Sequence, residues 1–138
     1  MFYIITSAFF LILLGFIYLL LKKERKSVKL SIFTYFLVLS IVFIVGHIYI
    51  SSTYHLTGSD MPLDGGFAQL LKWVSLFSYA ILIPLFILIG YKTLKFVNKA
   101  FSNVWIKTVA FSSWIIVLAG ITLFLLEIFI LIFYGVGP

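Results

Sequence analysis

Residues 72–92 read KWVSLFSYAILIPLFILIGYK, an uncharged apolar run over 73–91 that stands between two lysines. An α-helix rises about 1.5 Å per residue, so this run matches the roughly 30 Å hydrocarbon core of a bilayer. The pattern predicts a transmembrane helix, and the flanking lysines mark where the chain leaves the lipid.

Three further apolar stretches have the same character. We expect membrane spans over about 1–21, 30–51 and 108–134, in addition to 73–91. Lipid cannot satisfy the backbone groups of an open strand edge, so each span is expected to be a helix. The sequence therefore predicts an all-α, integral membrane, antiparallel four-helix bundle that forms a single transmembrane domain over residues 1–138.

Composition excludes several classes of protein. Hydrophobic residues form 64% of the chain and charged residues 10%, whereas about a quarter of the residues in a soluble domain are charged. The formal charge of +6 comes from Lys and Arg at span ends, where lipid phosphates attract them, so we expect no nucleic-acid partner. The chain has no cysteine, no Gly-rich phosphate loop, no zinc motif and no nucleophile elbow. We expect no catalytic residues and no metal site, while any cofactor stays unknown.

Orientation follows from the charges of the connections. The connections after the first and third spans carry nine basic residues, while the connection between the second and third spans carries only Lys72. Basic loops stay in the cytoplasm, so both termini and the 55–66 loop are expected on the outer side. The nine cytoplasmic residues are Lys22, Lys23, Arg25, Lys26, Lys29, Lys92, Lys95, Lys99 and Lys107.

Glu127 is the only acidic residue inside the four spans, and a carboxylate in hydrocarbon needs a partner or a function. It belongs to a stripe of small or polar residues two turns apart on the fourth span, and His47 belongs to a similar stripe on the second. Such stripes normally face other helices. We therefore expect a polar site formed by Glu127 and His47 with Tyr54 and Tyr134, in which the first two meet inside the bundle.

That polar site has two interpretations. A carboxylate and an imidazole in contact can titrate near neutral pH, which would provide proton or ion coupling. Alternatively, the contact is a buried hydrogen bond that fixes helix packing, or Glu127 meets a basic residue of another subunit. The sequence leaves both open.

Two other groups of residues carry weaker signals. The outer loop contains His55, Asp60 and Asp64, which offer imidazole and oxygen ligands for a cation without a recognised ligand spacing. On the cytoplasmic side, helical spacing predicts that the third span continues as a short amphipathic segment on the lipid surface. Its basic face comprises Lys92, Lys95 and Lys99.

Two hypotheses for function follow. The first is a small non-catalytic membrane subunit or assembly partner of a larger membrane complex, of respiratory or transport type, because the chain has almost no extramembrane mass. The second is a small oligomeric proton, ion or solute transporter or channel that uses Glu127 and His47. The expected partners are membrane lipids together with other integral membrane subunits or further copies of the chain.

Overall fold

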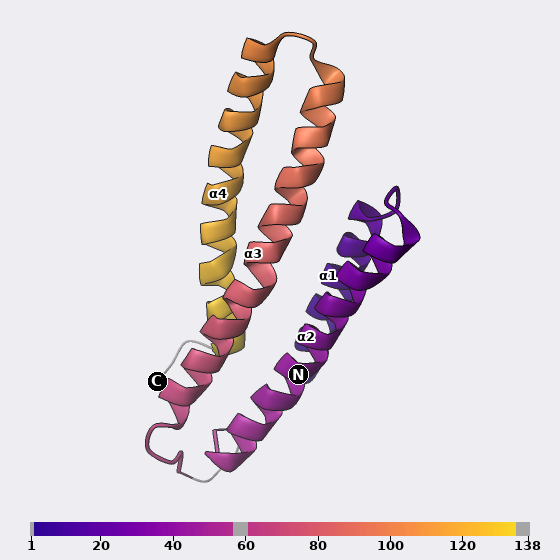
Figure 1. Cartoon of the computed structure of the whole chain (residues 1–138). Coiled ribbons are helices and arrows are strands. Elements are labelled where there is room, and N and C mark those ends of the chain that lie inside the picture. Colours follow the sequence, from indigo (N-terminus) through magenta and orange to yellow (C-terminus); the bar gives the residue numbers. More distant parts are fainter. Residues whose placement is uncertain (1, 57–60, 135–138) are drawn as a thin grey trace.

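The computed structural model describes residues 2–56 and 61–134, and everything regular in these ranges is helical (Figure 1). Each of the four helices is long and apolar enough to cross a membrane. The chain is therefore a helical, multi-pass membrane protein, as the sequence predicts. The helices are α1 (Phe2–Leu20), α2 (Lys26–Thr53), α3 (Gly66–Ala100) and α4 (Val104–Tyr134).

Helix α3 is longer than the span predicted for it. It has 35 residues, about 52 Å at 1.5 Å per residue, and it continues unbroken past Tyr91 to Ala100. The short surface segment expected after the third span is thus the end of α3 itself, which lies beside the start of α4 (Figure 1). Helix α4 begins at Val104, where the side-chain oxygen of Asn103 accepts a hydrogen bond from the Trp105 N–H at 2.9 Å.

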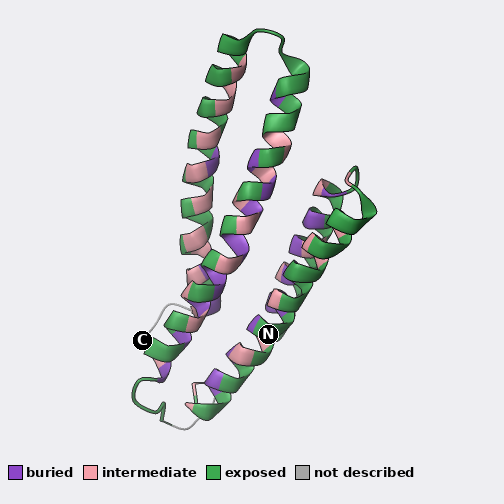
Figure 2. Ribbon diagram, in the orientation of Figure 1, coloured by how far each residue is buried: buried purple, intermediate pink, exposed green. Residues whose placement is uncertain are grey.

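The helices form two hairpins, α1 with α2 and α3 with α4, which lie closest at the end that carries the α2–α3 connection (Figure 1). The hairpins diverge toward the opposite end. Helix α3 is the most buried of the four, whereas α4 buries only three side chains and is otherwise exposed or half-exposed (Figure 2). The buried residues of α4 are Leu118, Phe129 and Phe133.

Phenylalanine rings fill the region where the four helices meet. The ring of Phe43 on α2 is fully buried and lies 5.4 Å from Phe10 of α1 and 5.5 Å from Phe77 of α3, centroid to centroid. On α4 it lies 5.7 Å from Phe129 and 5.1 Å from Phe133. Helices in lipid associate through close packing, because lipid tails are as apolar as the side chains. Aromatic pairs add about 0.5–1.5 kcal/mol each beyond the buried area.

A glycine allows α2 and α3 to approach closely beside this cluster. The indole of Trp73 lies against Gly46, and a Cβ atom on Gly46 would overlap the ring. The Trp73 N–H donates to the Phe43 carbonyl oxygen at 3.3 Å, and the Trp73 ring packs 4.6 Å from Phe77. The indole is therefore held by a hydrogen bond and by a ring contact, so moving it away from Gly46 costs free energy.

A second link between α2 and α3 involves Pro84. Proline removes the N–H that would bond the carbonyl four residues earlier, which here belongs to Ala80. The hydroxyl of Tyr35 on α2 donates to that carbonyl at 3.0 Å. The hydrogen bond therefore satisfies the backbone group that Pro84 leaves unpaired, and it joins the two hairpins near the middle of α3.

We expect Gly46→Ala to lower the free energy of unfolding by about 1–3 kcal/mol, because the new methyl group must displace the Trp73 ring. Gly15→Ala is the matched control, since a Cβ there meets no atom within 4 Å. The better helix propensity of alanine should leave the control unchanged or more stable by up to about 1 kcal/mol. Thermal unfolding in detergent, followed by circular dichroism, measures both. A Gly46→Ala protein as stable as wild type would contradict the close approach.

Candidate functional site

His47 lies inside the bundle, 6% exposed, and joins α2 to the end of α4. Its Nε2 atom is 3.1 Å from the carbonyl oxygen of Phe133. This carbonyl belongs to the last turn of α4, and side chains from other elements can supply donors to the carbonyls that end a helix. Nε2 therefore carries the proton and donates to Phe133, which leaves Nδ1 as an acceptor facing the Ser51 hydroxyl at 3.5 Å. His47 acts as a cap for α4.

Glu127 lies on the opposite face of α4 from the bundle core and is exposed. Within residues 2–56 and 61–134, no hydrogen bond or ion pair links its carboxylate to His47 or to another side chain. The expected contact between His47 and Glu127 is therefore not made in this chain. His47 uses the Phe133 backbone instead.

Helix geometry explains why Glu127 does not contact His47. The inner face of α4 follows residues spaced three or four apart that end at Phe129 and Phe133, whereas Glu127 is displaced from that face by more than a quarter turn. Ser113 and Gly120, which share its stripe, are exposed as well. A stripe of small residues indicates where another helix can approach, but it does not say which helix. Large Phe side chains determine the inner face.

The depth of Glu127 can be measured against α3. Gly90 of α3 lies beside Ile115 of α4, with 3.6 Å between Ile115 Cδ1 and a Cβ placed on Gly90. The two helices run in opposite directions (Figure 1). Twelve residues from this contact, toward the start of α3 and the end of α4, Glu127 is therefore level with Ser78. Ser78 is six residues from Lys72, about 9 Å along the axis. If Lys72 and Lys92 mark the two membrane boundaries, Glu127 lies well inside the hydrocarbon.

The two tyrosines of the expected polar site lie at the closed end of the bundle and away from Glu127. Tyr54 follows the last turn of α2, and its Cβ atom lies so close to Gly66 that no side chain fits there. The ring of Tyr134 packs edge-on against Phe67 at 6.5 Å between centroids. Both are half-buried packing residues in this structure.

The cation site expected in the 55–66 loop lies only partly within the described residues. Asp60 lies outside the described residues, whereas His55 and Asp64 are both exposed. His55 has a positive φ of 51°, which the turn after α2 requires. Among the described residues, no three His, Cys, Asp or Glu side chains gather in a way that would hold a metal ion.

The end of α3 that carries the lysines meets the α1–α2 connection through an ion pair. Lys92 donates to Glu24, and the Lys95 ammonium lies 3.6 Å from the same carboxylate oxygen. The hydrogen bond from Lys92, helped by the charges of both lysines and opposed by partial desolvation, holds the pKa of Glu24 below its usual range. The contribution of this pair to stability is therefore present above the unfolded pKa and is lost as the pH falls through the lower folded pKa.

Sequence reasoning missed the role of Glu24. It is the only acidic residue within the run KKERK at 22–26. A signal was present, since a lone carboxylate between two spans can pair with a lysine that ends a neighbouring span. The long-range pairing with α3 needed the three-dimensional arrangement.

Comparisons with models of protein families, with curated proteins and with solved structures find no match for this chain. The class of protein consequently rests on the four helices, and its function on the residues described above.

We expect His47→Leu to lower the free energy of unfolding by about 1–3 kcal/mol, because it removes the buried hydrogen bond from Nε2 to the Phe133 carbonyl. His47→Gln should lose much less, since a glutamine amide can place an N–H near the position of Nε2. Unfolding in mixed detergent micelles at several pH values provides the measurement. Equal losses in the two variants would show that the hydrogen bond does not stabilise the end of α4.

Proposed function

We propose that the chain is a non-catalytic subunit of a larger membrane complex, and that its α4 helix packs against a transmembrane helix of a different protein. In this proposal the four helices form an antiparallel bundle whose termini and 55–66 loop lie on the outer side. The two basic connections then lie in the cytoplasm, in agreement with the distribution of Lys and Arg.

The exposed carboxylate of Glu127 is the observation that carries the proposal. Ionisable residues within membrane helices almost always face a protein interior or a water-filled cavity. Glu127 does neither in the single chain, because it is on the exposed face of the least buried helix and about 9 Å inside the expected boundary. A monomer that leaves this carboxylate in lipid is an incomplete unit.

The same face of α4 is suited to another helix. Gly120 and Ser113 lie one and two heptads from Glu127, respectively, and are exposed, so a neighbouring backbone can approach closely. The fitting partner is a transmembrane helix with Lys, Arg, His or another donor at the depth of Glu127. A second copy of this chain fits less well, because α4 supplies a second carboxylate at that depth and no cation.

A transport function draws less support from the arrangement. Phenylalanine rings occupy the region between the helices, and His47 is engaged with a backbone carbonyl. A conduction path needs a polar lining. In the described part of the chain, few buried side chains are polar, and they are scattered over three helices: Thr6, Ser40, His47, Ser51 and Ser78.

Purification from the native membrane in mild detergent, followed by native mass measurement, tests the proposal. We expect a stoichiometric foreign membrane subunit with the wild-type chain. Glu127→Leu should reduce its recovery at least tenfold, because the partner's donor is left unpaired, which costs about 3–5 kcal/mol for a buried charge. Glu127→Gln should lose less, since the amide still accepts a hydrogen bond.

Val45→Ala is the matched control, since Val45 is a 60% exposed residue on α2, away from the proposed interface. It should leave recovery of the partner unchanged. A wild-type chain that purifies only as a monomer or as a homo-oligomer would contradict the proposal. Recovery of the partner at the wild-type level with Glu127→Leu would contradict the role of the carboxylate.

A further inference from the structure

At the end of the bundle opposite the aromatic cluster, four lysines surround one glutamate. They line a groove of about 640 Å³ between the α1–α2 connection and the last turns of α3. Four ammonium groups against one carboxylate leave three positive charges in excess. The groove is lined by Lys23, Glu24, Lys92, Lys95 and Lys99, together with Phe96 and Ala100.

The lysines retain hydrogen-bonding capacity after pairing with Glu24. The side chains of Lys92 and Glu24 are only 21% and 14% exposed, so this pair anchors the wall of the groove. Each ammonium has three donors, and one carboxylate cannot occupy the donors of several lysines. An anion with several acceptor oxygens, such as a phosphate group, matches what remains.

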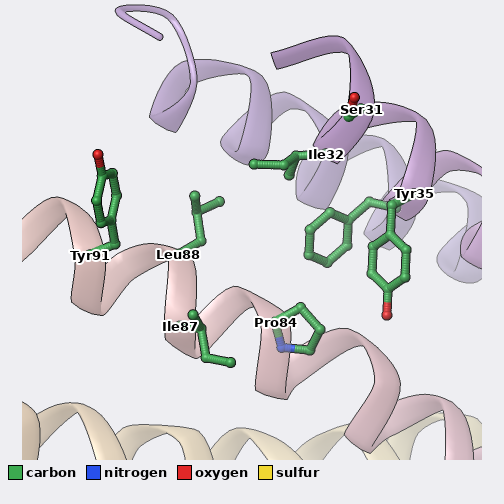
Figure 3. A pocket seen from close by; sticks show the side chains of 8 residues that line it. Ser31, Ile32, Tyr35, Pro84, Ile87, Leu88 and Tyr91 are labelled. Carbon is green, nitrogen blue, oxygen red and sulfur yellow. The ribbon is translucent and has the colours of Figure 1, made fainter. Parts of the chain in front are cut away.

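An apolar cleft of about 510 Å³ opens between α2 and α3 nearby (Figure 3). Two polar side chains in its wall already donate hydrogen bonds to backbone carbonyls. The Tyr35 hydroxyl donates to Ala80, and the Ser31 hydroxyl donates to the Ser27 carbonyl at 3.0 Å. The cleft therefore presents mainly hydrocarbon, from Ile32, Phe36, Pro84, Ile87 and Leu88.

The basic groove and the apolar cleft adjoin on α3. Tyr91 forms one end of the cleft (Figure 3), and the ammonium of Lys95 in the groove lies 5.7 Å from the centre of the Tyr91 ring. Lys92, the next residue, is in the groove as well. A ligand that reaches from one to the other within about one helical turn needs an anionic head and a hydrocarbon tail.

We infer that this end of the protein binds an anionic phospholipid, with the lipid phosphate among the lysines and an acyl chain in the cleft between α2 and α3. Basic pockets at the cytoplasmic ends of membrane helices attract anionic head groups. A free phosphate would leave the adjoining cleft without a role. A zwitterionic lipid would bring its own cation to a groove that already has an excess of positive charge. The inference does not depend on the proposed partner at Glu127.

The test counts lipids that stay bound. The full chain is reconstituted in vesicles of equal parts phosphatidylglycerol and phosphatidylcholine, extracted in mild detergent and measured by native mass spectrometry. Wild type should retain about one phosphatidylglycerol per chain and little phosphatidylcholine. The variant Lys95→Ala with Lys99→Ala, which keeps the Glu24–Lys92 pair, should retain roughly tenfold less.

Two controls separate a site from general attraction. Lys22→Ala with Lys26→Ala removes the same charge from exposed positions outside the groove and should leave retention unchanged. Ser31→Phe places a ring in the cleft and should reduce retention with every lysine intact, whereas Thr34→Phe, at an exposed α2 position outside the cleft, should not. Circular dichroism in phosphatidylcholine vesicles checks that each variant is folded.

A final arm distinguishes a lipid from a free anion. Inorganic phosphate added to the chain in phosphatidylcholine vesicles should not raise the melting temperature as phosphatidylglycerol does. Equal protection by inorganic phosphate would overturn the lipid assignment. The site would be overturned if the two double lysine variants lost equal amounts of bound phosphatidylglycerol. It would also be overturned if Ser31→Phe and the variant Lys95→Ala with Lys99→Ala both retained as much phosphatidylglycerol as wild type.

Discussion

The side chain of Phe43 is the point at which all four helices meet. It is fully buried on α2, and its ring touches rings from α1, α3 and α4. In lipid the hydrophobic effect does not drive helices together, so this dense contact carries much of the association. His47 one turn away fixes the end of α4, and Gly46 between them lets the Trp73 indole lie close against α2.

The hairpins pack closely only at the end that holds the aromatic cluster, which leaves space between them at the opposite end. The two hairpins separate away from the aromatic cluster (Figure 1), and two links between them there are the Tyr35 bond to Ala80 and the pairing of Glu24 with Lys92 and Lys95. Between those links lies an apolar cleft, and Glu24 and Lys92 themselves line the lysine groove. The lipid site that we infer is thus a consequence of splayed hairpins, and the partner site that we propose at Glu127 is a separate surface on α4.

The sequence predicted the number and type of the helices, because runs of apolar residues between charges report directly on the bilayer. It did not predict which face of α4 is inward. Spacing placed Glu127 on a helix-contacting stripe, but only the packing of Phe129 and Phe133 around Phe43 shows that this stripe points away from the bundle.

The orientation and the number of crossings underlie the whole account, and cysteine labelling tests both directly in a chain that has no native cysteine. Single cysteines at Ser27, Ser59 and Ser102 lie in or beside the three connections. An impermeant thiol reagent added to intact cells should label Ser59→Cys alone, and permeabilisation should expose all three. Labelling of Ser27→Cys and Ser102→Cys with protection of Ser59→Cys would reverse the orientation, and opposite results at Ser27 and Ser102 would contradict four crossings.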